Sequence, residues 1–171
     1  MDLIEDSFTA YAGARWPVLY RLAVLLVGES DADDLAQQTL FRAYTAWGRV
    51  SEAASPDAYV RRIMVNTMIA EKSRGRRGLE LLSRTDRREH TESPEQAVVQ
   101  REDLWGRINL LPARQRAVIV LRYYEDLSEA AIAEVLGCAP GTVKAHASAA
   151  LKTLRISVES AAELAPGGRD A

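Results

Sequence analysis

Few residues of this sequence could carry out covalent chemistry. The sequence holds two histidines in unrelated settings, His90 and His146, and one cysteine, Cys138. No Cys, His or carboxylate cluster has the spacing of a metal site, and neither a glycine-rich phosphate loop nor a nucleophile–base pair can be identified. The sequence therefore argues against an enzyme and predicts no metal and no cofactor. The chemistry that remains is binding through charges, amides and aromatic rings.

Positive charge is concentrated in one stretch of the chain. The formal net charge is −2, but residues 72–90 hold seven Lys or Arg against three Asp or Glu, and both flanking parts are mildly acidic. A local basic patch is enough to bind phosphate groups. A solvated linker would have the same composition, so the charge alone leaves both interpretations open.

The sequence on both sides of this stretch has helical periodicity, and the helices that it predicts must position the binding residues. No strand-like alternation persists, so we expect an all-α protein. In the first half, the apolar residues from Val18 to Leu26 predict a helix that ends near Gly28. Ser30 is expected to cap a second helix, and Ser55 with Pro56 to begin a third. Residues 73–95 are rich in Gly, Ser and charge and predict a linker with a short helical turn around residues 79–82.

The second half predicts four short helices. Pro112 separates the first two, Ser128 caps the third, and Gly137 separates the third from the fourth. Two short helices joined by a tight turn that contains glycine are typical of a helix-turn-helix, whose second helix enters the major groove. The residues expected to face the core are Leu104, Ile108, Leu111, Ala117, Val120, Leu121, Tyr124, Ile132, Val135, Leu136, Val143, Ala147, Ala150, Leu151 and Leu154.

Phe41 stands out on the second helix of the first half. The inward stripe of that helix is expected to hold Ala36, Leu40, Ala43 and Trp47, which leaves Phe41 at the centre of the polar outer face. An exposed phenylalanine either contacts a partner or is covered by another helix of the same domain. The pattern alone does not decide between the two.

The outer arc of the last helix is expected to face DNA. Small residues on this arc allow a close approach to base edges, and alanine can contact a thymine methyl group. Ala145 and Ala149 occupy its middle, however, and they offer no hydrogen bonds to bases. His146 lies at the flank of the arc and is either a contact or a half-buried residue.

These residues resemble the extracytoplasmic-function sigma factors of the sigma-70 superfamily. The stretch from Asp31 to Tyr44, Asp-Ala-Asp-Asp-Leu-Ala-Gln-Gln-Thr-Leu-Phe-Arg-Ala-Tyr, is similar to the family's helix that docks on the polymerase β′ clamp. The run Leu110-Leu-Pro-Ala-Arg-Gln-Arg, continued through Gly141-Thr-Val-Lys, is similar to the family's C-terminal domain. The resemblance covers residues 15–77 and 95–156.

The resemblance implies a role for each group of candidate residues. Core-polymerase binding is expected of Asp34, Gln37, Gln38 and Phe41. Reading and opening of the −10 element is expected of Tyr59, Arg61, Arg62, Asn66, Lys72 and Arg74. The loop from Arg49 to Pro56 is expected to capture a flipped base of the non-template strand. Contact with the −35 element is expected of Arg114, Arg116, Thr142, Lys144, His146, Ser148 and Lys152.

Two departures from the family pattern concern the −35 element. Family members often carry a serine at the position of Ala145 and an arginine at the position of Ala149. An arginine contact of this kind typically contributes ~1–3 kcal/mol. We therefore expect weak or unusual −35 recognition.

The resemblance also implies a domain plan and partners. We expect a sigma region 2 domain over residues 1–74, a flexible basic linker over 75–94, a region 4 domain over 95–160 and a disordered tail over 161–171. The expected partners are core RNA polymerase (the β′ clamp and β subunits), promoter DNA and an anti-sigma factor, in the cytoplasm and without a membrane. The alternative is a stand-alone helix-turn-helix regulator that binds duplex DNA and does not use core polymerase.

Overall fold

The computed structural model describes residues 3–83 and 100–164, and the side chains of residues 3–78 and 104–155. All elements in these residues are helices, and the all-α expectation is confirmed. The chain divides into two compact units, the first made largely of residues up to Ala97 and the second largely of residues from Val98 onward.

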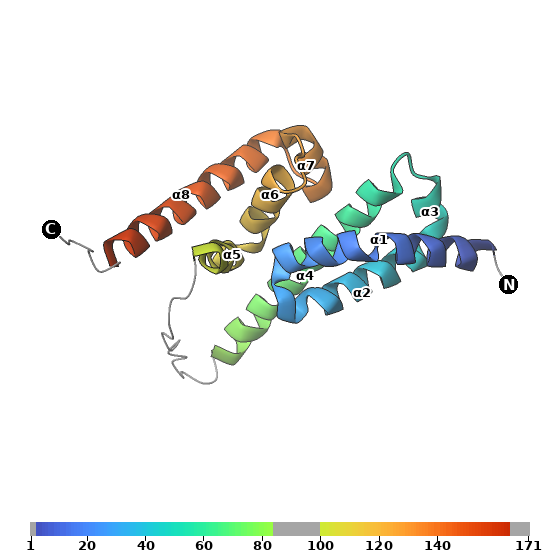
Figure 1. Cartoon of the computed structure of the whole chain (residues 1–171), viewed down its shortest axis with the longest axis horizontal. Coiled ribbons are helices and arrows are strands. Elements are labelled where there is room, and N and C mark those ends of the chain that lie inside the picture. Colours follow the sequence, from blue (N-terminus) through green and yellow to red (C-terminus); the bar gives the residue numbers. More distant parts are fainter. Residues whose placement is uncertain (1–2, 84–99, 165–171) are drawn as a thin grey trace. The chain divides into compact units, whose positions relative to one another are not determined.

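The first unit contains four helices (Figure 1), namely α1 (Leu3–Val27), α2 (Glu29–Thr45), α3 (Trp47–Glu52) and α4 (Pro56–Ser83). α2 packs against both α1 and α4. Ala32 and Ala36 are fully buried on α2, and such small side chains let neighbouring helices approach closely. Leu26, Leu35, Met64 and Met68 fill the space between the three helices. Within the part of the chain that the structure describes, the opposite face of α2 is exposed.

The helix starts in this unit agree with the capping residues predicted from the sequence, with one exception. The Ser55 hydroxyl accepts a hydrogen bond from the backbone N–H of Ala58 at 3.2 Å, which is the expected cap of α4. Ser30, by contrast, does not cap α2. The helix begins at Glu29, and Gly28 occupies the cap position with φ of 85°. A left-handed glycine lets α1 end and α2 begin without a connecting loop, so no side-chain cap is needed.

α4 extends into the segment that was expected to be a linker. α4 continues as one helix through Ser83, so the glycines at 75 and 78 do not end it, and the short helical turn expected around residues 79–82 is part of it. An isolated glycine costs only about 1 kcal/mol in a helix, and the charged residues around these two are good helix formers. Residues 84–94 of the expected linker lie outside the described residues.

The second unit contains α5 (Gln100–Leu110), α6 (Ala113–Tyr123), α7 (Glu129–Leu136) and α8 (Pro140–Leu164). Four helices were expected here, and the expected cap is present, because the Ser128 hydroxyl accepts a hydrogen bond from Ala131 N–H at 3.1 Å. α8 extends to Leu164, past the expected start of the tail at residue 161.

The core of the second unit joins α5 and α6 to α8. Ile108, Leu111, Ile119 and Ala150 form one buried cluster, and Leu154 packs against it. Three residues that were expected to face this core are instead exposed: Leu104, Tyr124 and Leu151. Each lies at the edge of its helix's apolar stripe, where the helical period alone cannot separate core from boundary.

Gly137 fixes the turn between α7 and α8. Its φ is 64°, and the N–H of Cys138 donates to the carbonyl oxygen of Ala133 at 3.1 Å. This six-residue closure after a left-handed glycine is a Schellman motif, which ends a helix and turns the chain sharply. The helix-turn-helix expected from the sequence is therefore present in α7 and α8.

Candidate polymerase and promoter interfaces

The outer face of α2 presents the four residues expected to bind core polymerase. Phe41 is 69% exposed, so the open question about this side chain is answered: within the described residues no helix covers it. Two amide–carboxylate pairs lie next to it. Gln37 donates to Asp33 at 2.6 Å and Gln38 donates to Asp34 at 3.0 Å. These pairs, four residues apart along the helix, hold the polar side chains around the phenylalanine in place.

The residues expected to read the −10 element all lie on α4. Arg62, Asn66, Lys72 and Arg74 are exposed, while Tyr59 and Arg61 are half-buried. From Tyr59 to Arg74 the helix rises about 22 Å, the length of several nucleotides of extended single strand. All six residues, three arginines and a lysine among them, are therefore carried by one helix.

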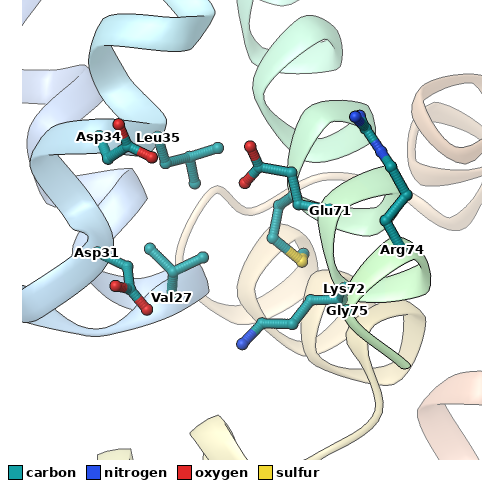
Figure 2. Close-up of a pocket in the computed structure, with 9 residues that line it drawn as sticks. Val27, Asp31, Asp34, Leu35, Glu71, Lys72, Arg74 and Gly75 are labelled. Atoms are coloured by element: carbon teal, nitrogen blue, oxygen red, sulfur yellow. The ribbon is translucent and has the colours of Figure 1, made fainter. Parts of the chain in front are cut away.

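An open cavity of about 480 Å³ lies between the α1–α2 junction and α4. Its walls include Asp31 and Asp34 on one side and Glu71, Lys72 and Arg74 on the other. Figure 2 shows Glu71 and Lys72 extending from α4 toward the helix that carries the two aspartates. The structure thus brings a residue expected to bind polymerase and two expected to bind DNA to a single cavity, which their sequence separation did not indicate.

The segment from Arg49 to Pro56, expected to be a loop, is partly helical, because residues 49–52 belong to α3 and Pro56 begins α4. The loop between the two helices is therefore only residues 53–55, and it is held at both ends. Val50, near the end of α3, is buried, and the N–H of Ala53 donates to its carbonyl oxygen at 3.2 Å. At the other end, Tyr59 N–H donates to the carbonyl oxygen of Ser55 at 3.1 Å. Ala54, between them, is exposed.

Sequence reasoning missed a group of side chains that contacts the start of α4. The Tyr11 hydroxyl donates to Asp57 at 3.0 Å, and Arg15 pairs with the same carboxylate at 2.5 Å. Burial, together with the hydrogen bond to Asp57, raises the pKa of Tyr11 above its usual range. Tyr11 and Asp57 are 46 residues apart in the chain, so no local pattern could have indicated the contact.

In the second unit, the expected DNA-facing arc of α8 is exposed. Ala145 and Ala149 lie in it together with Lys144, and His146 is half-buried at its flank. The other three residues expected on this helix, all exposed, are Thr142, Ser148 and Lys152. The arc therefore offers two lysines and two hydroxyls around a centre of alanine methyl groups.

Arg116 does not belong to this surface. Its side chain is 4% exposed, and its guanidinium donates to the carbonyl oxygens of Ile108 at 3.1 Å and Leu111 at 3.0 Å, as well as to that of Asn109. Burial lowers the pKa of this guanidinium. This position argues against the phosphate contact expected of Arg116, whereas the neighbouring Arg114 is exposed and remains available.

The described residues contain no group of three His, Cys, Asp or Glu side chains arranged to hold a metal ion. Among the helices that the structure describes, none is long and apolar enough to cross a membrane.

Comparison with known proteins identifies both units. Residues 6–78 match the family Sigma-70 region 2, and residues 101–154 match the family Sigma-70, region 4. The RNA polymerase sigma-E factor of Streptomyces coelicolor is 37% identical over 154 residues, which cover 87% of this chain and 84% of the relative. The ECF RNA polymerase sigma factor SigL of Mycobacterium tuberculosis is 32% identical over 150 residues, 83% of either chain.

Solved structures agree on the fold. The sigma factor RpoE in complex with the anti-sigma factor NepR from Bartonella quintana is similar with a TM-score of 0.68 and 24% identity, covering 90% of this chain and 97% of that one. CnrH, solved with the cytosolic domain of CnrY, is similar with a TM-score of 0.56 and 23% identity, covering 91% and 90%. The relatives' identity over most of the chain carries the assignment: this chain belongs to the extracytoplasmic-function sigma factors of the sigma-70 superfamily, which bind core RNA polymerase and direct transcription initiation at promoters.

Proposed function

We propose that this sigma factor docks on the β′ clamp of core polymerase through the outer face of α2, with Phe41 at the centre of the contact. The observation that carries the proposal is the 69% exposure of a phenylalanine surrounded by ordered polar side chains. An aromatic ring of this kind is a typical anchor of a protein interface, and the polar groups around it form the rim. The stand-alone regulator would leave this face without a use and is not favoured by the match to region 2.

Promoter opening is proposed to involve α4 and the loop from Arg49 to Pro56. The arginines and Lys72 of α4 would bind the phosphates of the −10 element, and the loop would take up one flipped base of the non-template strand. The −35 element is proposed to be read weakly by α8, with phosphate contacts from Arg114 but not from Arg116. The factor would act entirely by binding and strand opening, without a catalytic centre of its own, in the cytoplasm with its polymerase and DNA.

An anti-sigma factor is proposed as a further partner. RpoE and CnrH were both solved in complex with another protein, NepR and the cytosolic domain of CnrY. In this chain the exposed α2 face and the open cavity beside it offer a surface that such a protein could cover. Sequestration would then compete directly with polymerase binding.

Core binding tests the docking proposal. Labelled protein is titrated with bacterial core polymerase, and we expect Phe41→Ala to weaken binding by about tenfold to a hundredfold, the usual loss for a central aromatic anchor. Arg21→Ala, an exposed change on α1, is the control and should leave binding unchanged. Equal affinities for Phe41→Ala and the unmodified protein would show that core polymerase docks elsewhere.

A further inference from the structure

One side chain of α1 connects the two helices that flank the proposed base-capturing loop. The ring of Tyr11 lies 5.1 Å from the ring of Trp47, the first residue of α3. Its hydroxyl donates to Asp57, the second residue of α4, at 3.0 Å. The loop connects α3 to α4, so Tyr11 contacts the helix on each side of the loop.

The contact with α4 is a strong one. Asp57 lies in the first turn of α4, where the helix dipole favours a carboxylate. Arg15, one turn along α1 from Tyr11, pairs with the second oxygen of Asp57 at 2.5 Å. Hydrogen bonds to ionised acceptors are shorter and stronger than neutral ones. Tyr11 and Arg15 together therefore fix the position of the first turn of α4.

The contact with α3 is reinforced by two neighbours of Tyr11. Trp47 Nε1 donates to the hydroxyl of Ser7 at 2.8 Å, and the ring of Phe8 meets the ring of Trp47 edge-on at 5.3 Å. Ser7, Phe8, Tyr11 and Arg15 are spaced so that they share one face of α1. On this face, Ser7, Phe8 and Tyr11 contact Trp47 of α3, while Tyr11 and Arg15 contact Asp57 of α4.

We propose that Tyr11 is a positioning residue for promoter opening: it holds the first residue of α3 and the first turn of α4 at a fixed distance, and thereby sets the shape of the loop that takes up the flipped base. This inference rests on the proposed function of the Arg49–Pro56 loop. Tyr11 is half-buried and acts through Asp57 and Trp47, whereas DNA is contacted by the loop and α4.

The test uses the holoenzyme and a single-stranded non-template oligonucleotide carrying the −10 sequence that promoter selection with this holoenzyme yields. Tyr11→Phe keeps the ring against Trp47 and removes only the hydroxyl. We expect it to weaken oligonucleotide binding by about threefold to tenfold, with core affinity unchanged. This is less than the full effect of losing a hydrogen bond to a charged group, because the hydroxyl acts on the DNA only through the loop. Tyr20→Phe is the matched control, because Tyr20 lies on the same helix but stacks on Trp16, and it should bind like the unmodified protein.

A scan with abasic sites separates positioning from a general structural effect. Each base of the −10 oligonucleotide is removed in turn, and the difference between Tyr11→Phe and the unmodified protein should disappear at one position only, that of the captured base. A difference that persists at every position, or a parallel loss of core affinity, would mean that Tyr11 merely stabilises the domain, and the proposal would be wrong.

Ala54→Glu distinguishes failure of the inference from failure of the loop's proposed function. Ala54 is exposed in the loop, and a carboxylate there would repel the strand. If Ala54→Glu weakens oligonucleotide binding and Tyr11→Phe does not, the loop captures a base without help from Tyr11, and only the inference fails. If Ala54→Glu has no effect, the loop does not take up the base, and both proposals fall.

Discussion

The Nε atom of Arg116 lies 3.1 Å from the carbonyl oxygen of Ile108. A cation on α6 thereby occupies the C-terminal end of α5, where the last carbonyl groups of a helix lack partners within it and carry partial negative charge. The same guanidinium also binds the carbonyl oxygen of Leu111, in the turn between the two helices. Arg116 therefore acts as a side-chain cap that holds the end of α5 against α6.

Replacing Arg116 should destabilise the second unit without a direct effect on DNA contacts. Arg116→Met would leave buried carbonyl groups unsatisfied, and we expect a loss of about 2–4 kcal/mol in the free energy of unfolding, measured by urea denaturation. Arg114→Met, two residues away but exposed, is the control and should change stability by less than about 0.5 kcal/mol. Similar stabilities for the two variants would show that the cap contributes little.

Gly137 should be intolerant of a side chain. Its φ of 64° is costly for residues with a Cβ, so Gly137→Ala should reduce the stability by about 1–2 kcal/mol in the same denaturation assay. Gly141 makes a matched control. It lies in the first turn of α8, a Cβ there would meet nothing within 4 Å, and Gly141→Ala should be neutral or slightly stabilising. Equal losses at both glycines would contradict the role of the Gly137 turn.

An arginine at position 149 should strengthen −35 recognition. Ala149 is exposed at the centre of the α8 arc, and a bidentate contact to a base is worth ~1–3 kcal/mol. Ala149→Arg should therefore raise holoenzyme affinity for a promoter with a −35 element by about tenfold. Ala149→Leu adds size without charge and should bring no gain. An equal gain on a scrambled −35 sequence would indicate non-specific phosphate binding instead.

The Tyr11 hydroxyl predicts a pH dependence of stability. Its pKa is raised in the folded protein by burial and by the bond to Asp57, so the folded state holds this proton more tightly than the unfolded state. The corresponding stability is fully present below about pH 10, the usual value for tyrosine in an unfolded chain, and is lost as the pH rises beyond it. The difference in free energy of unfolding between the unmodified protein and Tyr11→Phe should therefore shrink above pH 10. Parallel pH profiles of the two proteins would contradict this coupling.

The architecture could be predicted from the sequence because its signals are local. Apolar periodicity, Ser55 and Ser128 at helix starts and Gly137 at a helix end each act within a few residues, and the structure confirms them. The period of a single helix also predicts Phe41 on the outer face of α2, but whether another helix covers it was left open, and only the structure shows that the side chain is exposed.

The remaining features depend on contacts between distant residues. Arg116 shares the residue type and spacing of a phosphate-binding arginine, and only the packing of α5 against it shows that its side chain is buried. Tyr11 and Asp57 meet because α1 packs against the start of α4, and the cavity near Asp34 forms where residues 68–75 of α4 pass the junction of α1 and α2. Tertiary packing determines the burial of Arg116, the Tyr11–Asp57 contact and the cavity, and local patterns in a single sequence do not reveal that packing.

The most direct test of the account is run-off transcription on a promoter library with bacterial core polymerase. Core alone, core with the unmodified protein, and core with Phe41→Ala or Asp34→Ala are compared on the same templates. We predict initiation at a shared sequence that requires the protein and falls at least about tenfold with Phe41→Ala, since the ring anchors the docking face. Undiminished initiation by both variants, or binding of duplex promoter DNA by the protein without core polymerase and without initiation, would contradict the proposed docking of this factor through α2.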